Sequence, residues 1–184
     1  MKKMIVLYGP SGVGKSTLAK FLKSLGVPEA ISVTSRNPRE GELEGVDYYF
    51  RSKEEIKEIS LAEQNEYPSS NGLNLYGISI EEIDKRFRES EIIFAVVEKN
   101  GMMQLKERYG DMLVCVYITM PPELIETRLR GRGESEANIQ ARIQQSIKGK
   151  EFDQAYLADA IIVNIDLEKS KEELLSIAGV MQHA

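Results

Sequence analysis

The feature that most constrains this chain is a glycine-rich stretch close to its start. An apolar run, Met4–Tyr8, is followed by Gly9-Pro-Ser-Gly-Val-Gly-Lys-Ser16 and then by a helical pattern, Thr17–Leu22. The spacing GxxxxGK[ST] between a strand and a helix is typical of a P-loop. Glycines at these positions allow backbone conformations that a Cβ would forbid, so the main-chain N–H groups can close around a phosphate. The stretch therefore predicts a nucleotide-binding loop.

Individual positions of this loop have expected roles. We expect Lys15 to reach the outer phosphates of ATP and the Ser16 hydroxyl to be a ligand of Mg²⁺. A chance glycine-rich turn is the alternative, and it leaves the lysine, the hydroxyl and both flanking elements unexplained. The predicted ATP-binding residues are Gly9, Pro10, Ser11, Gly12, Val13, Gly14, Lys15, Ser16 and Thr17.

Length and composition limit the remaining possibilities. The 184 residues suffice for one substantial domain, and 42% hydrophobic with 29% charged residues is ordinary for a globular protein. No apolar run has membrane-spanning length, and no signal peptide precedes the first strand, so we expect no membrane partner. The single Cys115 cannot form an internal disulfide, which favours a reducing compartment, the cytoplasm.

The charges indicate small anionic ligands. A formal net charge of −5 argues against nucleic acid bound over a broad surface. Arginines that only keep a surface soluble would be scattered, and this explanation is reasonable for Arg130 taken by itself. The arginines instead gather in two stretches: Arg36 with Arg39, and Arg128, Arg130 and Arg132 with Arg142.

The order of the elements predicts an α/β fold. Apolar strands at Ile92–Val97, Met112–Thr119 and Ala160–Val163 alternate with helical patterns. This rhythm around a P-loop is typical of a P-loop NTPase with a doubly wound parallel sheet. We also expect residues 63–72 to be a polar, turn-rich stretch that joins two edge strands, the second near Leu75–Ile78, and we expect a long helix over Ala137–Leu157.

We assign the whole chain, residues 1–184, to one domain with three parts. Residues 1–31, 80–130 and 158–184 form the core, residues 32–79 form a small inserted acceptor-binding lobe, and residues 131–157 form a helical lid and the following helix.

Helical spacing supports the lid. Arg128 and Arg132 are four residues apart and share one helix face, while Arg130 points away. Arg142 follows on the next helix, after a hinge bounded by glycines. Lid closure would bring these arginines onto a transferring phosphoryl group, so the predicted catalytic residues are Lys15, Arg128, Arg132 and Arg142.

Together these motifs resemble the guanylate kinase family over most of the chain. They are GPSGVGKST, the segment Ser32–Phe50 with its arginine pair, Leu75-Tyr-Gly77, the lid arginines, and Ile162-Val-Asn164. The resemblance implies a nucleoside monophosphate kinase that transfers the γ-phosphoryl group of ATP to GMP, giving GDP and ADP, with Mg²⁺ as cofactor. It also implies GMP contacts from Ser32, Arg36, Arg39, Tyr48, Glu63, Tyr76, Ser79 and Glu98.

The base-reading residues depart from the family pattern. Guanine presents N–H donors, so its pocket needs acceptors, usually carboxylates. Glu63 is the assigned carboxylate and Glu66 the reserve, because residues 60–74 carry an apparent insertion. Val96 stands where the family has the first aspartate of a D-x-D, and Glu98 stands at the second.

Two other functions remain open at this point. A related kinase of the same fold, such as a ribose 1,5-bisphosphate kinase, would keep the arginines and lose the guanine carboxylates. A guanylate-kinase-like protein-interaction module typically lacks a working P-loop and lid, whereas this chain keeps Lys15 and Ser16. The residues also leave open whether the chain acts as a monomer or a homodimer.

Overall fold

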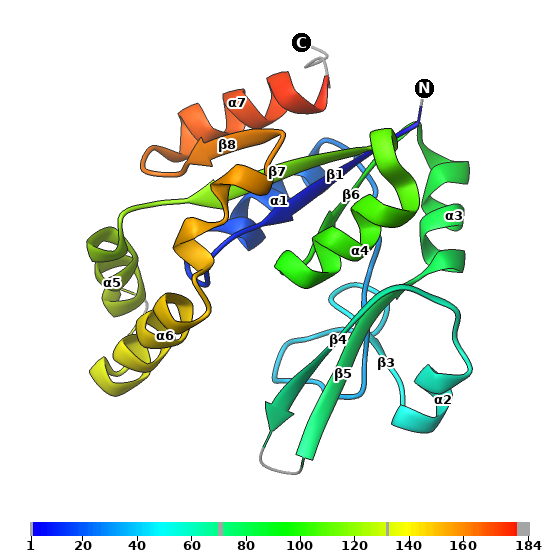
Figure 1. The fold of residues 1–184 in the computed structure, drawn as a ribbon, viewed down its shortest axis with the longest axis horizontal. Coiled ribbons are helices and arrows are strands. Elements are labelled where there is room, and N and C mark those ends of the chain that lie inside the picture. The colour runs from blue at the N-terminus through cyan, green and yellow to red at the C-terminus, as the bar shows by residue number, and fades with distance from the viewer. Residues whose placement is uncertain (1, 70–71, 132, 180–184) are drawn as a thin grey trace.

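The alternation of side chains along β1 (Lys3–Tyr8) organises the core. Met4, Val6 and Tyr8 face one side of the sheet, Ile5 and Leu7 face the other, and all five are fully buried. A strand that is buried on both faces belongs in the middle of a sheet covered by helices. The computed structural model, which describes residues 2–69, 72–131 and 133–179, shows this arrangement (Figure 1).

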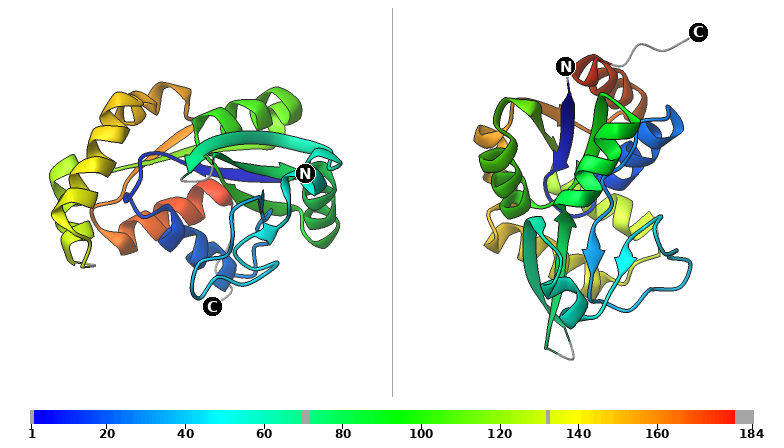
Figure 2. Two further views of the ribbon diagram at one scale, coloured as in Figure 1. Left: turned by 90° about the horizontal axis from the view of Figure 1, so that it is seen from below. Right: turned by 90° about the vertical axis from the view of Figure 1, so that its right-hand side faces the viewer.

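The core sheet has the strand order β6-β1-β7-β8, and all its pairs are parallel. Its other strands are β6 (Ile92–Val96), β7 (Leu113–Thr119) and β8 (Ala160–Val163). Helices cover both faces (Figure 2). On the Ile5 face lie α1 (Lys15–Ser24), α5 (Pro122–Gly131), α6 (Glu136–Lys148) and α7 (Leu167–Ala178). On the Met4 face lie α3 (Ile80–Glu89) and α4 (Lys99–Tyr109), so the doubly wound α/β fold is confirmed.

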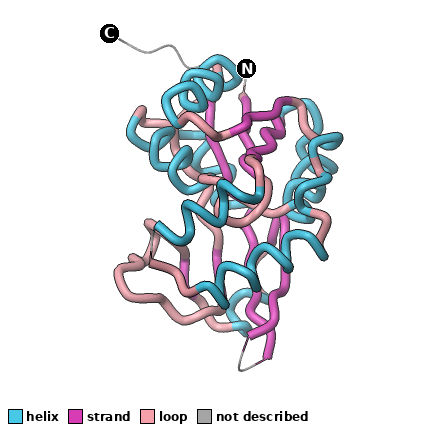
Figure 3. The backbone as a smooth tube through the Cα atoms, turned by 90° about the vertical axis from the view of Figure 1, so that its left-hand side faces the viewer, coloured by secondary structure: helices cyan, strands magenta, loops and turns pink. Residues whose placement is uncertain are grey.

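A second, mixed sheet with the order β3-β2-β5-β4 lies below the core. It consists of β2 (Val33–Thr34), β3 (Tyr49–Phe50), β4 (Leu61–Ser69) and β5 (Gly72–Ser79). β2 and β3 have two residues each, and the chain between them is mostly loop, which Figure 3 draws in pink. The short helix α2 (Lys53–Lys57) follows β3 and begins at a capping box made by Ser52 and Glu55.

The two expected strands are present, but the turn-rich stretch expected at residues 63–72 is mostly strand. Residues Leu61–Ser69 form β4, which pairs antiparallel with β5 from Leu61 opposite Ser79 to Ser69 opposite Gly72. β4 is an edge strand, and such a strand tolerates polar side chains on the faces that point to solvent or to a cavity. The polar composition of residues 63–69 therefore gives no sign in the sequence that they form a strand.

The free edge of β4 is covered by a side chain from the core. The Oε1 of Gln104, on α4, accepts from the backbone N–H of Gln64 at 3.0 Å, and its Nε2 donates to the carbonyl of Gln64 at 2.9 Å. The amide thus makes both hydrogen bonds that a neighbouring strand would make at this residue.

The expected helix over Ala137–Leu157 is also too long. α6 ends at Lys148, and Lys150 follows with φ = 50°, in the left-handed region. Two 3₁₀ turns replace the rest of the helix: Glu151–Asp153 and Ala155–Leu157. A third, Gly110–Met112, joins α4 to β7. Among the described residues, no helix is long and apolar enough to cross a membrane.

Candidate active site

The glycine-rich loop joins β1 to α1 in a conformation that only glycine permits at two of its positions. Gly9 has φ = 138°, and a Cβ there would lie 2.1 Å from the carbonyl oxygen of Ile118. Gly14, with φ = 101°, precedes α1, and a Cβ there would lie 2.3 Å from the Nδ2 of Asn164. That Nδ2 donates to the carbonyl of Val13 at 2.7 Å. The free N–H groups at the start of α1 therefore have a fixed direction, which favours an anion.

Lys15 lies at the first position of α1 and folds back over the loop. Its Nζ donates to the carbonyls of Gly9 at 2.6 Å and Pro10 at 2.8 Å. Burial lowers the pKa of Lys15, and the nearby carboxylates of Glu98 and Glu151 oppose that effect. Both carboxylates therefore favour the charged ammonium that a phosphate requires.

Ser16 fits the expected Mg²⁺ ligand. It is exposed in the first turn of α1, next to Lys15. Within the described ranges, no group of three or more His, Cys, Asp or Glu side chains is arranged to hold a metal ion. Mg²⁺ is commonly held by one or two protein oxygens together with phosphates and waters, and a lone hydroxyl beside a nucleotide site suits that donor set.

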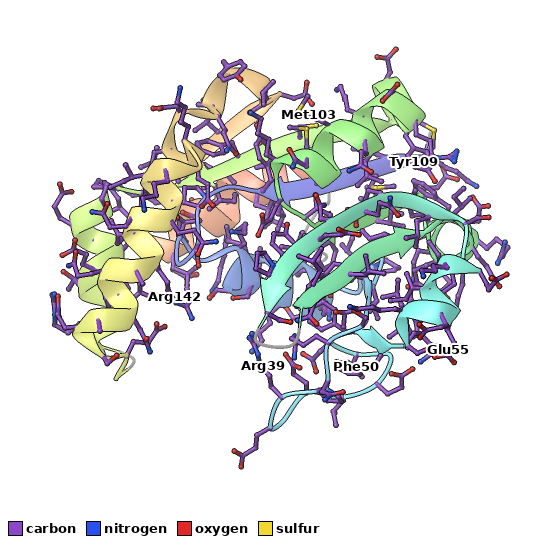
Figure 4. All side chains as sticks on the ribbon, turned by 60° about the horizontal axis from the view of Figure 1, so that its bottom comes forward. Arg39, Phe50, Glu55, Met103, Tyr109 and Arg142 are labelled. Carbon is purple, nitrogen blue, oxygen red and sulfur yellow. The ribbon has the colours of Figure 1, made fainter. Side chains whose placement is uncertain are left out.

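A cavity of about 710 Å³ opens in front of the loop, a volume in the range of small-molecule sites. It brings together residues from the loop, the second sheet, the end of β6 and α6. The predicted site residues that line it are Gly9, Ser11, Lys15, Ser32, Arg36, Arg39, Tyr48, Glu63, Tyr76, Glu98 and Arg142. Figure 4 shows Arg39 and Arg142 on separate elements that face this space.

One corner of the cavity is cationic and aromatic. Arg36 pairs with both carboxylate oxygens of Glu42 at 2.9 Å, and its Nε donates to the Tyr76 hydroxyl at 3.1 Å. The guanidinium lies 5.3 Å from the centre of the Tyr48 ring. Its bond to Glu42 holds the pKa of that carboxyl below its usual value. The corner is therefore already organised, with one arginine held in place by a carboxylate.

Arg39 differs from Arg36. Its backbone N–H donates to Glu42 at 2.8 Å, which fixes the loop, while the residue itself is exposed. No ion pair of its guanidinium occurs within the described part of the chain. Arg39 is thus the cation of this corner that can take a new anion without giving up a protein carboxylate.

The structure separates the two candidate carboxylates of the base pocket. Glu63, Asn65 and Tyr67 alternate along β4 and line the cavity, whereas Glu66 lines a second cavity. Asn65 lies between the two cavities and lines both. Glu63 is only 4% exposed. Burial raises the pKa of Glu63 to about 7, and Glu98 adds to the rise, while hydrogen bonds from Asn65 and from the backbone of Ile78 lower it.

Of the three predicted catalytic arginines, two lie beside the loop and the third falls outside the described residues. The Nη1 of Arg142 donates to the Ser11 hydroxyl at 3.3 Å, and its Nε pairs with Glu134 at 3.1 Å. Arg128 donates to the carbonyls of Asn164 and Ile165 at 2.8 and 3.2 Å, beside Gly14. Arg132 falls outside the described residues. Arg142 and Arg128 therefore flank the loop on its two sides.

Among the predicted GMP contacts, Ser79 lies apart from the others. Its hydroxyl accepts from the backbone N–H of Glu82 at 3.0 Å and caps α3. It is not among the described residues that line the cavity.

Several residues that line the cavity were not predicted. A two-residue alternation starting at Glu63 would have indicated Asn65 and Tyr67, had β4 been recognised as a strand. Glu151, whose carboxylate accepts from the Ser146 hydroxyl at 2.7 Å, has no sequence signal, because the early end of α6 brings it there. The residues missed are Asn65, Tyr67, Val97, Lys99, Asn100, Gln145, Ser146, Gly149, Glu151 and Gln154, while Val96, noted for its missing carboxylate, also lines the cavity.

The sequence is similar to known proteins along almost its whole length. The family model described as guanylate kinase matches residues 1–180. The chain belongs to the guanylate kinase family. A guanylate kinase of Fusobacterium nucleatum is 38% identical over 95% of this chain and 94% of its own length. One from Helicobacter pylori is 35% identical over 98% of this chain and 88% of its own length.

Solved structures of the guanylate kinase family support the fold. The crystal structure of guanylate kinase from Anaplasma phagocytophilum covers all of this chain, and 87% of that structure is matched, with a TM-score of 0.75 at 24% identity. At that identity the likeness concerns the fold, and it extends over the second sheet and the helices α5 and α6 as well as the core.

Proposed function

We propose that this chain is a guanylate kinase that transfers the γ-phosphoryl group of ATP to GMP, giving ADP and GDP. The observation that carries the proposal is a buried carboxylate, Glu63, in the same cavity as Lys15 and Arg39. Lys15 marks a donor phosphate, Arg39 marks an acceptor phosphate, and an ionised Glu63 accepts hydrogen bonds from a base that presents donors. Guanine presents two such donors side by side, N1–H and the exocyclic amine.

The donor side would be held mainly by backbone. The N–H groups of the loop and of the start of α1 bind phosphate oxygens, and the Nζ of Lys15 exchanges its carbonyl partners for the outer phosphates. Ser16 would hold Mg²⁺, which neutralises phosphate charge when bound.

The acceptor side would be held by side chains. Arg39 and the hydroxyls of Tyr48 and Tyr76 offer donors to the GMP phosphate, while Arg36 shapes the corner through its pair with Glu42. Glu63 would accept from the base, and Glu98 lines the same cavity. These contacts place an acceptor phosphate oxygen towards the donor phosphates, which is the positioning that phosphoryl transfer chiefly needs.

Lys15 and the arginines of α5 and α6 would stabilise the negative charge on the transferring phosphoryl group in the transition state. Arg142 already contacts the loop at Ser11, and Arg128 lies beside Gly14. Cations placed where charge spreads over the transferring group accelerate related reactions by ~10³-fold or more. By covering the reacting groups, α6 would also exclude water and so limit hydrolysis of ATP.

A coupled assay of ADP release tests the proposal. The acceptors are GMP, dGMP, AMP, UMP and ribose 1,5-bisphosphate, each with ATP and Mg²⁺. The expected result is a kcat/KM for GMP at least about tenfold above that of every other acceptor. Preference for ribose 1,5-bisphosphate would indicate a different kinase of this fold, and no turnover of any acceptor would indicate an interaction module.

A further inference from the structure

Asn65 stands beside Glu63 in a position to complete the base pocket. The two residues lie on the same face of β4, and the Nδ2 of Asn65 donates to the Oε2 of Glu63 at 3.0 Å. An ionised carboxylate only accepts hydrogen bonds, so the amide must turn its Nδ2 to Glu63 and its Oδ1 away from it. No donor to that Oδ1 occurs among residues 2–69, 72–131 and 133–179.

The groups around Glu63 show which neighbour favours its ionised form. The titratable groups that face Glu63 are both acidic: Glu98, at the start of α4, and Tyr67, on β4. α4 places Gly101 against this pair, where a Cβ would lie 2.6 Å from the Oε2 of Glu63 and 3.2 Å from the Nδ2 of Asn65, and the backbone of Ile78, on β5, hydrogen-bonds Glu63. Asn65 is therefore the neighbouring side chain that favours the ionised form of Glu63.

We propose that Asn65 is a specificity-determining residue: it holds Glu63 through Nδ2 and accepts the second hydrogen of the guanine amine through Oδ1. This inference rests on the proposed function. The donors of guanine match these acceptors in number, because guanine has three N–H hydrogens on this edge: N1–H and two on the amine. The carboxylate accepts N1–H and one amine hydrogen, which leaves the other amine hydrogen for an amide oxygen. Hypoxanthine, the base of IMP, has N1–H and lacks the amine, so it cannot use Oδ1.

The test compares GMP with IMP as acceptors in Asn65→Leu, which removes both the donor and the acceptor. Asn65→Ala provides the same test if the leucine variant fails to fold. The ratio of kcat/KM for GMP to that for IMP should fall about tenfold, because one hydrogen bond to the amine is lost. In addition, the pH at which kcat/KM for GMP reaches half its maximum should rise by about half a unit or more. The kcat at saturating GMP should stay within about twofold of that of the unchanged protein.

Two further variants separate the parts of the inference. Asn65→Asp keeps an acceptor and removes the donor, so above about pH 8 it should retain the preference for GMP, while its pH midpoint should rise. Asn74→Leu changes an asparagine of β5 that does not line the cavity, and it should behave as the unchanged protein does. Glu63→Gln removes this carboxyl, so any pH dependence left in that variant belongs to other groups, such as the phosphate of the nucleotide or Lys15.

Melting temperatures show which variants are folded. The inference is overturned if folded Asn65→Leu keeps both the GMP preference and the pH midpoint. It is also overturned if turnover of GMP and IMP falls equally with the midpoint unchanged, since that is the mark of a structural role. An unchanged protein that does not prefer GMP in the acceptor panel would refute the proposed function as well, whereas the other two results leave the proposed function intact.

Discussion

The donor loop and the acceptor pocket meet in one cavity and are built in opposite ways. The loop is one continuous segment whose shape is set by glycines and by the bond from Asn164 to Val13, and it offers mainly backbone N–H groups. The pocket is assembled from side chains on separate elements, such as Arg39, Glu63 and Glu98. A backbone site depends on a short sequence, whereas a side-chain site depends on strand register and packing. If the proposed roles hold, a substitution is more easily tolerated in the phosphate-binding loop, and the acceptor pocket is the part whose specificity is more easily changed.

The largest expected effect comes from Lys15→Ala, which removes the loop side chain that we propose reaches the outer phosphates. We expect kcat to fall by ~10³-fold or more, because charge on the transferring group loses its fixed cation. GMP affinity, measured by titration calorimetry, should change by less than about twofold, because the pocket side chains remain. Lys20→Ala, an exposed lysine on α1, is the control. Turnover that survived in Lys15→Ala would place the donor phosphates elsewhere.

Glu63→Gln tests the acceptor pocket. We expect kcat/KM for GMP to fall by roughly 100-fold, because an amide both loses the charge and turns one donor towards a donor-bearing base. Glu66→Gln, on the other face of β4, should have little effect.

The same residue predicts a pH dependence. The pKa of Glu63 is raised to about 7, so the ionised form that accepts from guanine predominates above that pH and is lost as the pH falls through it. Steady-state kcat/KM for GMP should therefore decrease below about pH 7. That step should flatten in Glu63→Gln, and equal profiles for the two proteins would contradict the role of Glu63.

Arg39→Ala should have a smaller effect that is confined to binding. We expect the KM for GMP to rise about tenfold with kcat little changed, because one charge-assisted contact to the acceptor phosphate is lost. Arg51→Ala removes a nearby arginine that pairs with Glu44, and it serves as the control. If Arg39→Ala left the KM for GMP unchanged, the acceptor phosphate would lie at another corner.

Gly101→Ala is the finest probe of the pocket. A Cβ there would lie 2.6 Å from the Oε2 of Glu63, so we expect the carboxyl to shift and the KM for GMP to rise about threefold. The melting temperature should hold or increase, because alanine favours a helix over glycine by about 1 kcal/mol. In a Glu63→Gln background the same substitution should add little. A fully additive effect would show that Gly101 acts on another group.

The parts of the fold that follow from local pattern could be predicted from the sequence. The loop, the buried strands and the last strand, Ala160–Val163, were all found because each carries its signal in adjacent residues. The length of β4 could not be predicted, because its polar residues face a cavity and an edge, so alternation of apolar and polar side chains is absent. The end of α6 was placed too late because Lys150 adopts a left-handed conformation that no residue type there requires.

The candidate site divides in the same way. Lys15 and Arg39 could be assigned from motifs, since each lies at a defined distance from glycine or proline in the chain. Glu63 could not be separated from Glu66 without knowing which face of β4 each occupies. Glu151 depends on where a helix stops, so only the folded arrangement brings it near Lys15.

The pairing of Gln104 with β4 has a consequence for how this protein behaves at high concentration. An exposed strand edge is a template on which another chain can add, which is a common start of aggregation. Here α4 supplies its own side-chain amide to that edge at Gln64, and the opposite edge, β3, is only two residues long. The acceptor lobe therefore carries its own protection against intermolecular strand addition, and Gln104→Ala should make the protein less soluble without touching the site.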